Sequence, residues 1–101
     1  MIESGPPTFK CYPVFMDWLR TGKKRFDIRL YDPNDQRISR LLLVRRQSTL
    51  DIPVEVVMAF VNTEDPKDVL VFQYLGIAFS EDMPGWCIFK LGNLVKGTSS
   101  E

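Results

Sequence analysis

The chain of 101 residues is long enough for one domain with a buried core and too short for a second one. Hydrophobic residues make up 45% of it and aromatic residues 12%, which is typical of globular proteins and excludes fibrous and disordered classes. The 13 basic and 13 acidic residues cancel, so no net charge attracts nucleic acid or an anionic membrane over a long range.

The two ends of the chain differ in composition from the middle. We expect the proline-rich residues 1–8 and the polar residues 96–101 to be flexible tails around a single β-rich domain of residues 9–95. The start has no secretory signal pattern, and no stretch reaches the roughly 20 apolar residues that span a bilayer. Without export, Cys11 and Cys87 are expected to stay reduced, in a cytoplasmic or nuclear protein with no membrane partner.

The first expected element is a short helix over residues 12–20. Pro13 suits the first turn of a helix, and Gly22 suits its end. Four apolar residues have the spacing of one helical face: Val14, Phe15, Trp18 and Leu19.

A change of period follows at residue 25. Residues 25–31 alternate strictly, which predicts a strand with Phe26, Ile28 and Leu30 toward the core and the charged residues toward water. Residues 32–35, with the sequence Asp-Pro-Asn-Asp, are typical of a turn.

Two further strands are expected in the middle of the chain. Residues 38–46 are predicted to form one strand, which residues 48–53 end. Residues 54–61 are apolar on both faces except for Glu55, which indicates a central strand covered on two sides.

The last third of the chain predicts a β-hairpin. Residues 68–79 are a long apolar strand, and residues 86–91 are a second one across a turn that contains Pro84 and Gly85. Five strands separated by short turns predict an all-β fold, an antiparallel β-sandwich or small barrel with a short amino-terminal helix.

Residues suited to catalysis are few. The chain has no histidine, which removes the commonest general base and imidazole metal ligands. The carboxylates of Asp27, Asp51, Glu55 and Glu81 are more simply explained as solvated strand or turn residues. We expect no enzyme, no cofactor and no metal site.

The turn of the hairpin is the first candidate interaction site. Phe79, Met83 and Trp86 surround it, and an exposed apolar cluster there would bind the hydrophobic side chains of a partner. Phe89 and Tyr74 would support these contacts. The alternative is that Phe79 and Trp86 close the end of the core, and the same two interpretations apply to Phe15 and Trp18.

Basic residues give the second candidate. Residues 23–25 and 45–46 could form one phosphate-binding patch, with Tyr12 or Tyr31 stacking on bases as in an oligonucleotide-binding barrel. The alternative, which we favour, is that these charges protect strand edges from pairing.

The hairpin resembles the amino-terminal domain of the Hikeshi family of nuclear import carriers for heat-shock chaperones. The residues that carry the resemblance are Phe72–Gly76, Pro84, Ile88–Leu91 and Gly92–Leu94, with Phe26–Asp27, Ile38–Val44 and Val54–Val61 in the same order upstream. It covers about residues 25–97, as the order and spacing of strands.

The resemblance implies a non-catalytic protein that binds a heat-shock chaperone and the Phe-Gly repeats of nuclear pore proteins, and that forms a homodimer. The helical carboxy-terminal region of the family has no counterpart in this sequence. The implied function is therefore narrower than that of a carrier: a small β-rich module that binds hydrophobic peptide segments. A structural subunit of a larger assembly is the alternative, followed by the oligonucleotide-binding barrel.

Overall fold

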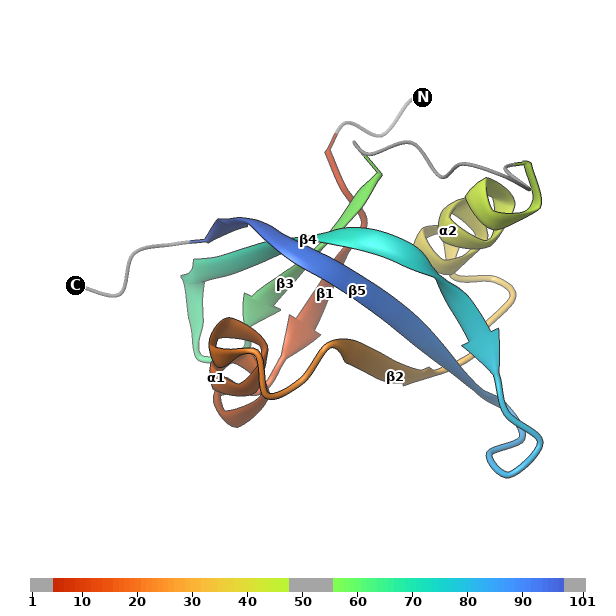
Figure 1. Ribbon diagram of the computed structural model, residues 1–101, viewed down its shortest axis with the longest axis horizontal. Helices are drawn as coiled ribbons and strands as arrows, with labels where there is room; N and C mark the ends of the chain where they lie inside the picture. Colours follow the sequence, from red (N-terminus) through yellow and green to blue (C-terminus); the bar gives the residue numbers. More distant parts are fainter. Residues whose placement is uncertain (1–4, 48–55, 98–101) are drawn as a thin grey trace.

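The computed structural model describes residues 5–47 and 56–97, except for the side chains of 44–47. These residues form one curled five-stranded sheet with two helices (Figure 1). The elements are β1 (Thr8–Cys11), α1 (Pro13–Thr21), β2 (Phe26–Leu30), α2 (Gln36–Gln47), β3 (Val57–Asn62), β4 (Asp65–Phe79) and β5 (Trp86–Gly97).

The sheet has the strand order β1-β3-β4-β5-β2. β1 is parallel to β3, and every other neighbouring pair is antiparallel. The fold is therefore largely β, as expected, but the sheet is mixed and curls into a half-barrel instead of forming a purely antiparallel sandwich. A parallel pair needs a long crossover connection, and here α1, β2 and α2 provide it.

Helix α1 confirms the expected position of the first element. Pro13 occupies its first turn, and Gly22 ends it with a φ of 84° and an N–H that donates to the Leu19 carbonyl. The buried residues are Met16 and Leu19, so the helix is rotated from the expected face.

Helix α2 replaces the strand predicted for residues 38–46. The Asp35 carboxylate accepts a hydrogen bond from the Arg37 N–H at 2.9 Å, and the Asp35 carbonyl accepts one from the Ser39 N–H at 3.0 Å. These bonds satisfy the first turn of a helix. Ile38 and Leu41, three residues apart, are both buried, which is the spacing of one helical face and not of a strand.

Strand β2 lies where expected, but its two faces are exchanged. Asp27 is only 3% exposed, whereas Phe26 is 44% and Leu30 62% exposed. The reason is an ion-pair cluster inside the half-barrel: the Asp27 carboxylate pairs with Arg29 and, at 3.6 Å, with Lys24. Because these charged groups stabilise one another on the inner side, the apolar residues of β2 lie outside.

Arg29 also closes the open side of the half-barrel. β1 and β2 are the two edge strands of the sheet. The guanidinium of Arg29 donates from β2 to the Lys10 carbonyl of β1 at 2.6 Å, and Arg37 donates to the neighbouring Thr8 carbonyl at 2.8 Å. Both guanidiniums lie over the ring of Phe9. Edge carbonyls that are occupied in this way do not pair with a foreign strand.

The hairpin of β4 and β5 is confirmed, and it supplies much of the core. β3, expected as a central strand, lies between β1 and β4; residues 48–55, including Glu55, are outside the described part of the chain. Side chains of both helices and of the inner face of the sheet form one cluster: Phe9, Met16, Leu19, Ile38, Leu41, Met58, Phe60, Leu70, Phe72, Tyr74, Ile77, Cys87, Phe89 and Leu91, with Cys11. Both helices therefore cover the inner face.

The ordered strands extend beyond the expected domain limits. β1 begins at Thr8, and the carbonyl of the buried Pro7 accepts a hydrogen bond from the Ala59 N–H. β5 continues to Gly97. The remainder of the expected tails, residues 1–4 and 98–101, lies outside the described residues. In the described part of the chain, no helix is long and apolar enough to cross a membrane.

Candidate interaction surface

The outer face of the sheet carries an apolar stripe that neither helix covers. We name it the outer stripe, and it consists of Phe26, Ile28 and Leu30 of β2 with Trp86 and Ile88 of β5. Ile28 lies directly opposite Ile88, and Leu30 lies opposite Trp86, so their side chains share one face of the antiparallel pair. Trp86 is 38% exposed, and both isoleucines are half-buried.

The hairpin end separates residues that the sequence analysis had grouped together. Phe79 lies opposite Cys87, the residue after Trp86, so Phe79 and Trp86 project from opposite faces of the hairpin. Phe79 packs edge-on against Tyr31 with ring centroids 5.4 Å apart, whereas Trp86 lies with Leu30. Both are exposed, and Met83 is half-buried in the turn between them.

Tyr74 and Phe89, expected to support the site, belong to the core. Both side chains have no exposed surface, and their ring centroids are 6.5 Å apart. The Tyr74 hydroxyl donates to the Leu41 carbonyl at 3.1 Å, which ties β4 to α2. Neither side chain is therefore accessible for direct contact with a partner.

A pocket lies at the Phe26 end of the outer stripe, between α1 and β2. Its volume is about 360 Å³, and it is lined by Phe15, Trp18, Lys23, Lys24, Phe26 and Ile28. Phe15 and Trp18 pack edge-to-face at 5.4 Å, and the Lys24 ammonium lies 4.5 Å from the centre of the Phe15 ring. Phe15 and Trp18 thus form the wall of an open pocket next to the stripe. We name it the α1–β2 pocket.

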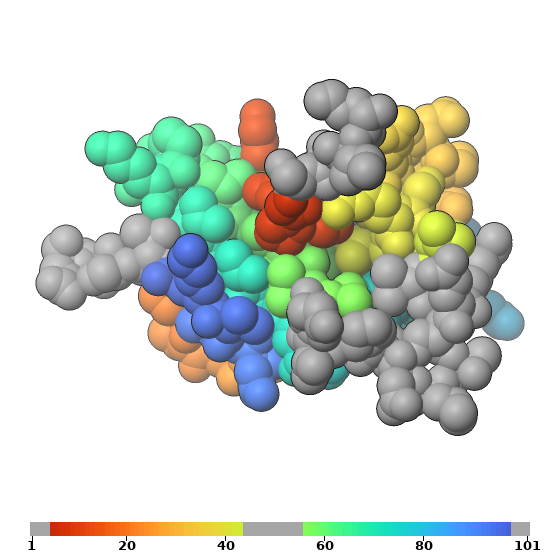
Figure 2. Space-filling model, turned by 90° about the horizontal axis from the view of Figure 1, so that it is seen from above, coloured from red at the N-terminus to blue at the C-terminus, as the bar shows by residue number. Residues whose placement is uncertain are grey.

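The two basic segments of the sequence do not form one patch. Residues 23–25 follow α1, whereas residues 45–46 lie near the end of α2. α1 and α2 lie at opposite ends of the molecule in both views, α1 in orange and α2 in yellow (Figures 1 and 2). In the described backbone the two segments are therefore far apart.

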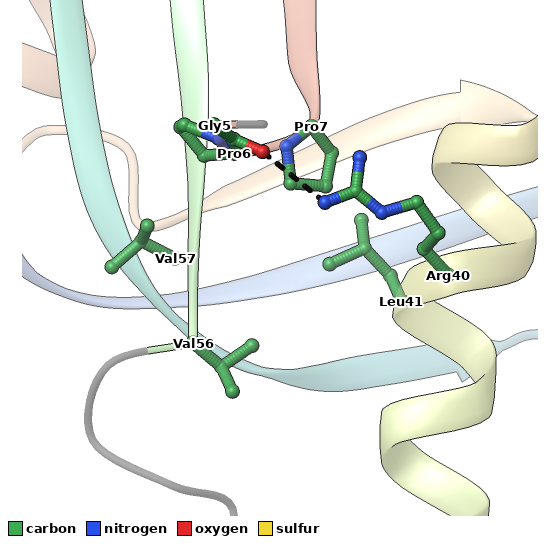
Figure 3. A pocket seen from close by; sticks show the side chains of 7 residues that line it. All are labelled: Gly5, Pro6, Pro7, Arg40, Leu41, Val56 and Val57. Atoms are coloured by element: carbon green, nitrogen blue, oxygen red, sulfur yellow. Dashed lines mark hydrogen bonds between the residues drawn. The ribbon is translucent and has the colours of Figure 1, made fainter. Parts of the chain in front are cut away.

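A second hollow lies where the amino-terminal segment meets α2 and the start of β3. Its volume is about 280 Å³, and Figure 3 shows its wall of Gly5, Pro6, Pro7, Arg40, Leu41, Val56 and Val57. Arg40 donates to the Gly5 carbonyl at 3.2 Å. Because aliphatic groups dominate this wall, it offers no group of side chains for acid–base chemistry.

The two cysteines are free thiols in the core. Burial, followed by the nearby negative charge of Asp27, raises the pKa of both Cys11 and Cys87 above the usual 9.0. Both thiols are therefore protonated, and not nucleophilic, at neutral pH. Among the residues that the structure describes, no three Cys, Asp or Glu side chains gather into a possible metal site.

The sequence matches no family model and no curated protein. The functional assignment therefore depends on the geometry of the outer stripe and of the pocket beside it.

Proposed function

We propose that this chain is a non-catalytic protein-interaction module that binds apolar peptide segments on the outer stripe. The observation that carries the proposal is the exchanged face of β2. Phe26, Leu30 and Trp86 are each more than a third exposed and lie together on one face. Contiguous exposed apolar surface on a small domain is typical of a binding site.

The stripe has the dimensions of a short peptide site. From Phe26 to Leu30 the strand is about 13 Å long, which matches four extended residues of a ligand. A phenylalanine of the ligand would pack between Trp86 and Leu30, and each such contact is worth about 1–2 kcal/mol before ordering costs. Binding of this kind is weak and gains from repetition, which suits repeated Phe-Gly segments.

The resemblance to the Hikeshi family points to the same ligands, a heat-shock chaperone or Phe-Gly repeats, and to the cytoplasm or nucleus. Residues 38–44, which the resemblance takes as a strand, form part of α2. The proposal therefore rests on the outer stripe. The two free thiols are in keeping with a reducing compartment.

The test measures binding of a labelled Phe-Gly repeat peptide by fluorescence anisotropy. Trp86→Ala and Leu30→Ala are each expected to weaken binding about 5- to 30-fold, the equivalent of one lost apolar contact. The matched control is Leu94→Ala, which removes a similarly exposed side chain, 41% against 38% for Trp86, elsewhere on β5. Equal affinity for wild type, Trp86→Ala and Leu30→Ala would refute the proposal.

The same exposed stripe also fits the alternative of a structural subunit, in which an assembly covers it permanently. That alternative predicts that the isolated chain self-associates and that Leu30→Glu makes it monomeric. Sedimentation of both proteins across a concentration series separates the two functions, because the oligomeric state of a peptide-binding module does not depend on the stripe and stays the same after the substitution.

A further inference from the structure

The partner chemistry follows from the charges around the α1–β2 pocket, on the premise that the proposed function is correct. Phe26 and Ile28 belong both to the outer stripe and to the pocket wall. A peptide that lies along the stripe from Leu30 toward Phe26 therefore reaches the pocket with its next residue.

Positive charge surrounds that end of the stripe. Lys23 lines the pocket and is exposed, and Lys90 is exposed directly opposite Phe26 on the neighbouring strand. Neither lysine forms an ion pair with any residue in the described part of the chain. Lys24 differs, because it pairs with Asp27.

The acidic groups near the pocket are already engaged. Asp27 is buried and shared between Lys24 and Arg29. Asp17, next to Trp18, pairs with Arg20 on the same helix. Lys23 and Lys90 are therefore available to pair with a ligand, and the Phe15 and Trp18 side chains of α1 line the pocket beside Lys23.

We propose that the partner segment carries an acidic residue beside its apolar side chains, and that this carboxylate lies between Lys23 and Lys90 at the mouth of the α1–β2 pocket. The apolar side chains occupy the stripe, and the adjoining aliphatic part of the acidic residue packs against Phe26. The opposite end of the stripe, at Leu30 and Trp86, has no lysine. The two ends of the site therefore differ in charge, and this difference sets the direction in which the peptide binds.

A peptide fits these observations better than a single-stranded nucleic acid. A nucleic acid needs several cations along its backbone to be held. At this end of the stripe the cations without an ion pair to any described residue are Lys23, Lys90 and Arg25, and the Arg25 guanidinium already donates to the Gly92 carbonyl at 3.3 Å. A single ligand carboxylate between Lys23 and Lys90 can pair with both lysines.

The test compares three Phe-Gly repeat peptides that differ only after the last phenylalanine, where they carry two glutamates, two glutamines or two lysines. We expect the glutamate peptide to bind about three- to tenfold more tightly than the glutamine peptide at low salt. The lysine peptide is expected to bind more weakly than either, and the differences are expected to shrink at high salt.

Charge reversal locates the effect. Lys23→Glu and Lys90→Glu are expected to abolish the preference for glutamate and to leave the affinity for the glutamine peptide unchanged. Lys96→Glu is the matched control, because Lys96 is exposed on the same strand six residues beyond Lys90, and it is expected to leave the preference intact.

The outcomes separate the two proposals. If the glutamate and glutamine peptides bind equally, the acidic preference is refuted and the apolar module stands. If no peptide binds, the proposed function fails, and this inference fails with it. If a short single-stranded oligothymidine binds more tightly than the glutamate peptide and competes through Lys23 and Lys90, the ligand class is a nucleic acid and the inference is overturned.

Discussion

The inner and outer faces of the sheet are built from similar residues but are covered differently. Phe89 has no exposed surface, whereas Trp86, on the opposite face of the same strand, is 38% exposed. α1 and α2 both pack on the inner face. On the outer side of β2 and β5, neither helix packs on the apolar side chains. The difference separates residues that hold the fold from residues available to a partner.

The largest expected effect comes from removing a ring on the inner face. Phe89→Ala should lower the free energy of unfolding by about 3–5 kcal/mol, because it leaves a cavity in the core. Trp86→Ala should lower it by only about 1 kcal/mol, because that ring is partly in water already. Urea denaturation followed by circular dichroism measures both.

The same two variants can also contradict this comparison of the inner and outer faces. Comparable losses for Phe89→Ala and Trp86→Ala would mean that the outer stripe is part of the core, and Trp86 would lose its place in the proposed site. Ile88→Ala serves as an intermediate, because Ile88 is half-buried between those two residues.

A smaller effect is expected at the charged cluster that orients β2. Asp27→Ala leaves the charges of Lys24 and Arg29 without their carboxylate. We expect a loss of about 2 kcal/mol, less than for a fully buried pair, because both cations can reach water. Asp82→Ala, in the exposed hairpin turn, is the control and should change stability by less than about 0.5 kcal/mol.

Asp27 also offers a sharper test of the same idea. The Arg29 guanidinium bridges to the Lys10 carbonyl, so its loss should release the edge of β1. The double variant Asp27→Ala with Arg29→Ala should therefore be no more stable than Asp27→Ala alone, as measured in a double-mutant cycle. Recovery of wild-type stability in the double variant would show that the cluster does not orient the strand.

The hairpin and α1 could be predicted from the sequence because their signals are local. Long apolar runs on either side of a Pro-Gly turn, and Pro13 and Gly22 at the ends of a helical pattern, each act within a few residues. The position of β2 was predictable for the same reason. Its alternation gives the strand but does not say which face is inside.

The orientation of β2 could not be predicted because it depends on distant residues. Asp27 is buried beside Arg29, whose guanidinium reaches β1, a strand that lies far away in sequence. The sequence did hold one local signal: Lys24 and Arg29 lie within three residues of Asp27, so this carboxylate could be neutralised inside.

The prediction for α2 failed for a different reason. The run Leu41-Leu42-Leu43 suits a buried strand or a helix equally, and the signal for a helix is Asp35, which directly precedes α2. The Phe26, Ile28 and Leu30 side chains of the outer stripe were not predicted to be exposed, because their alternation was interpreted as core-facing.

The smallest expected effect concerns the cover of the inner face by α2. Asp35→Ala should cost about 1 kcal/mol of stability, because it removes the side-chain oxygen that caps the helix. Asp35→Asn keeps a capping oxygen and should cost only a few tenths of a kcal/mol. The pKa of the Asp35 carboxyl is lowered from its usual 3.8, mainly because the Arg37 side chain donates hydrogen bonds to it.

A carboxyl whose pKa is lowered by folding stabilises the protein above its unfolded pKa, and this contribution is lost as the pH falls through the folded value. Wild type should therefore lose more stability than Asp35→Asn between about pH 4 and the lower folded pKa, and the two should converge in more acidic solution. Thermal melts of both proteins across this range measure the difference. Parallel curves would show that the Asp35–Arg37 pair contributes nothing to the attachment of α2. The cover of the inner face would then depend on Ile38 and Leu41 alone, and the contrast with the uncovered outer face would be one of apolar packing only.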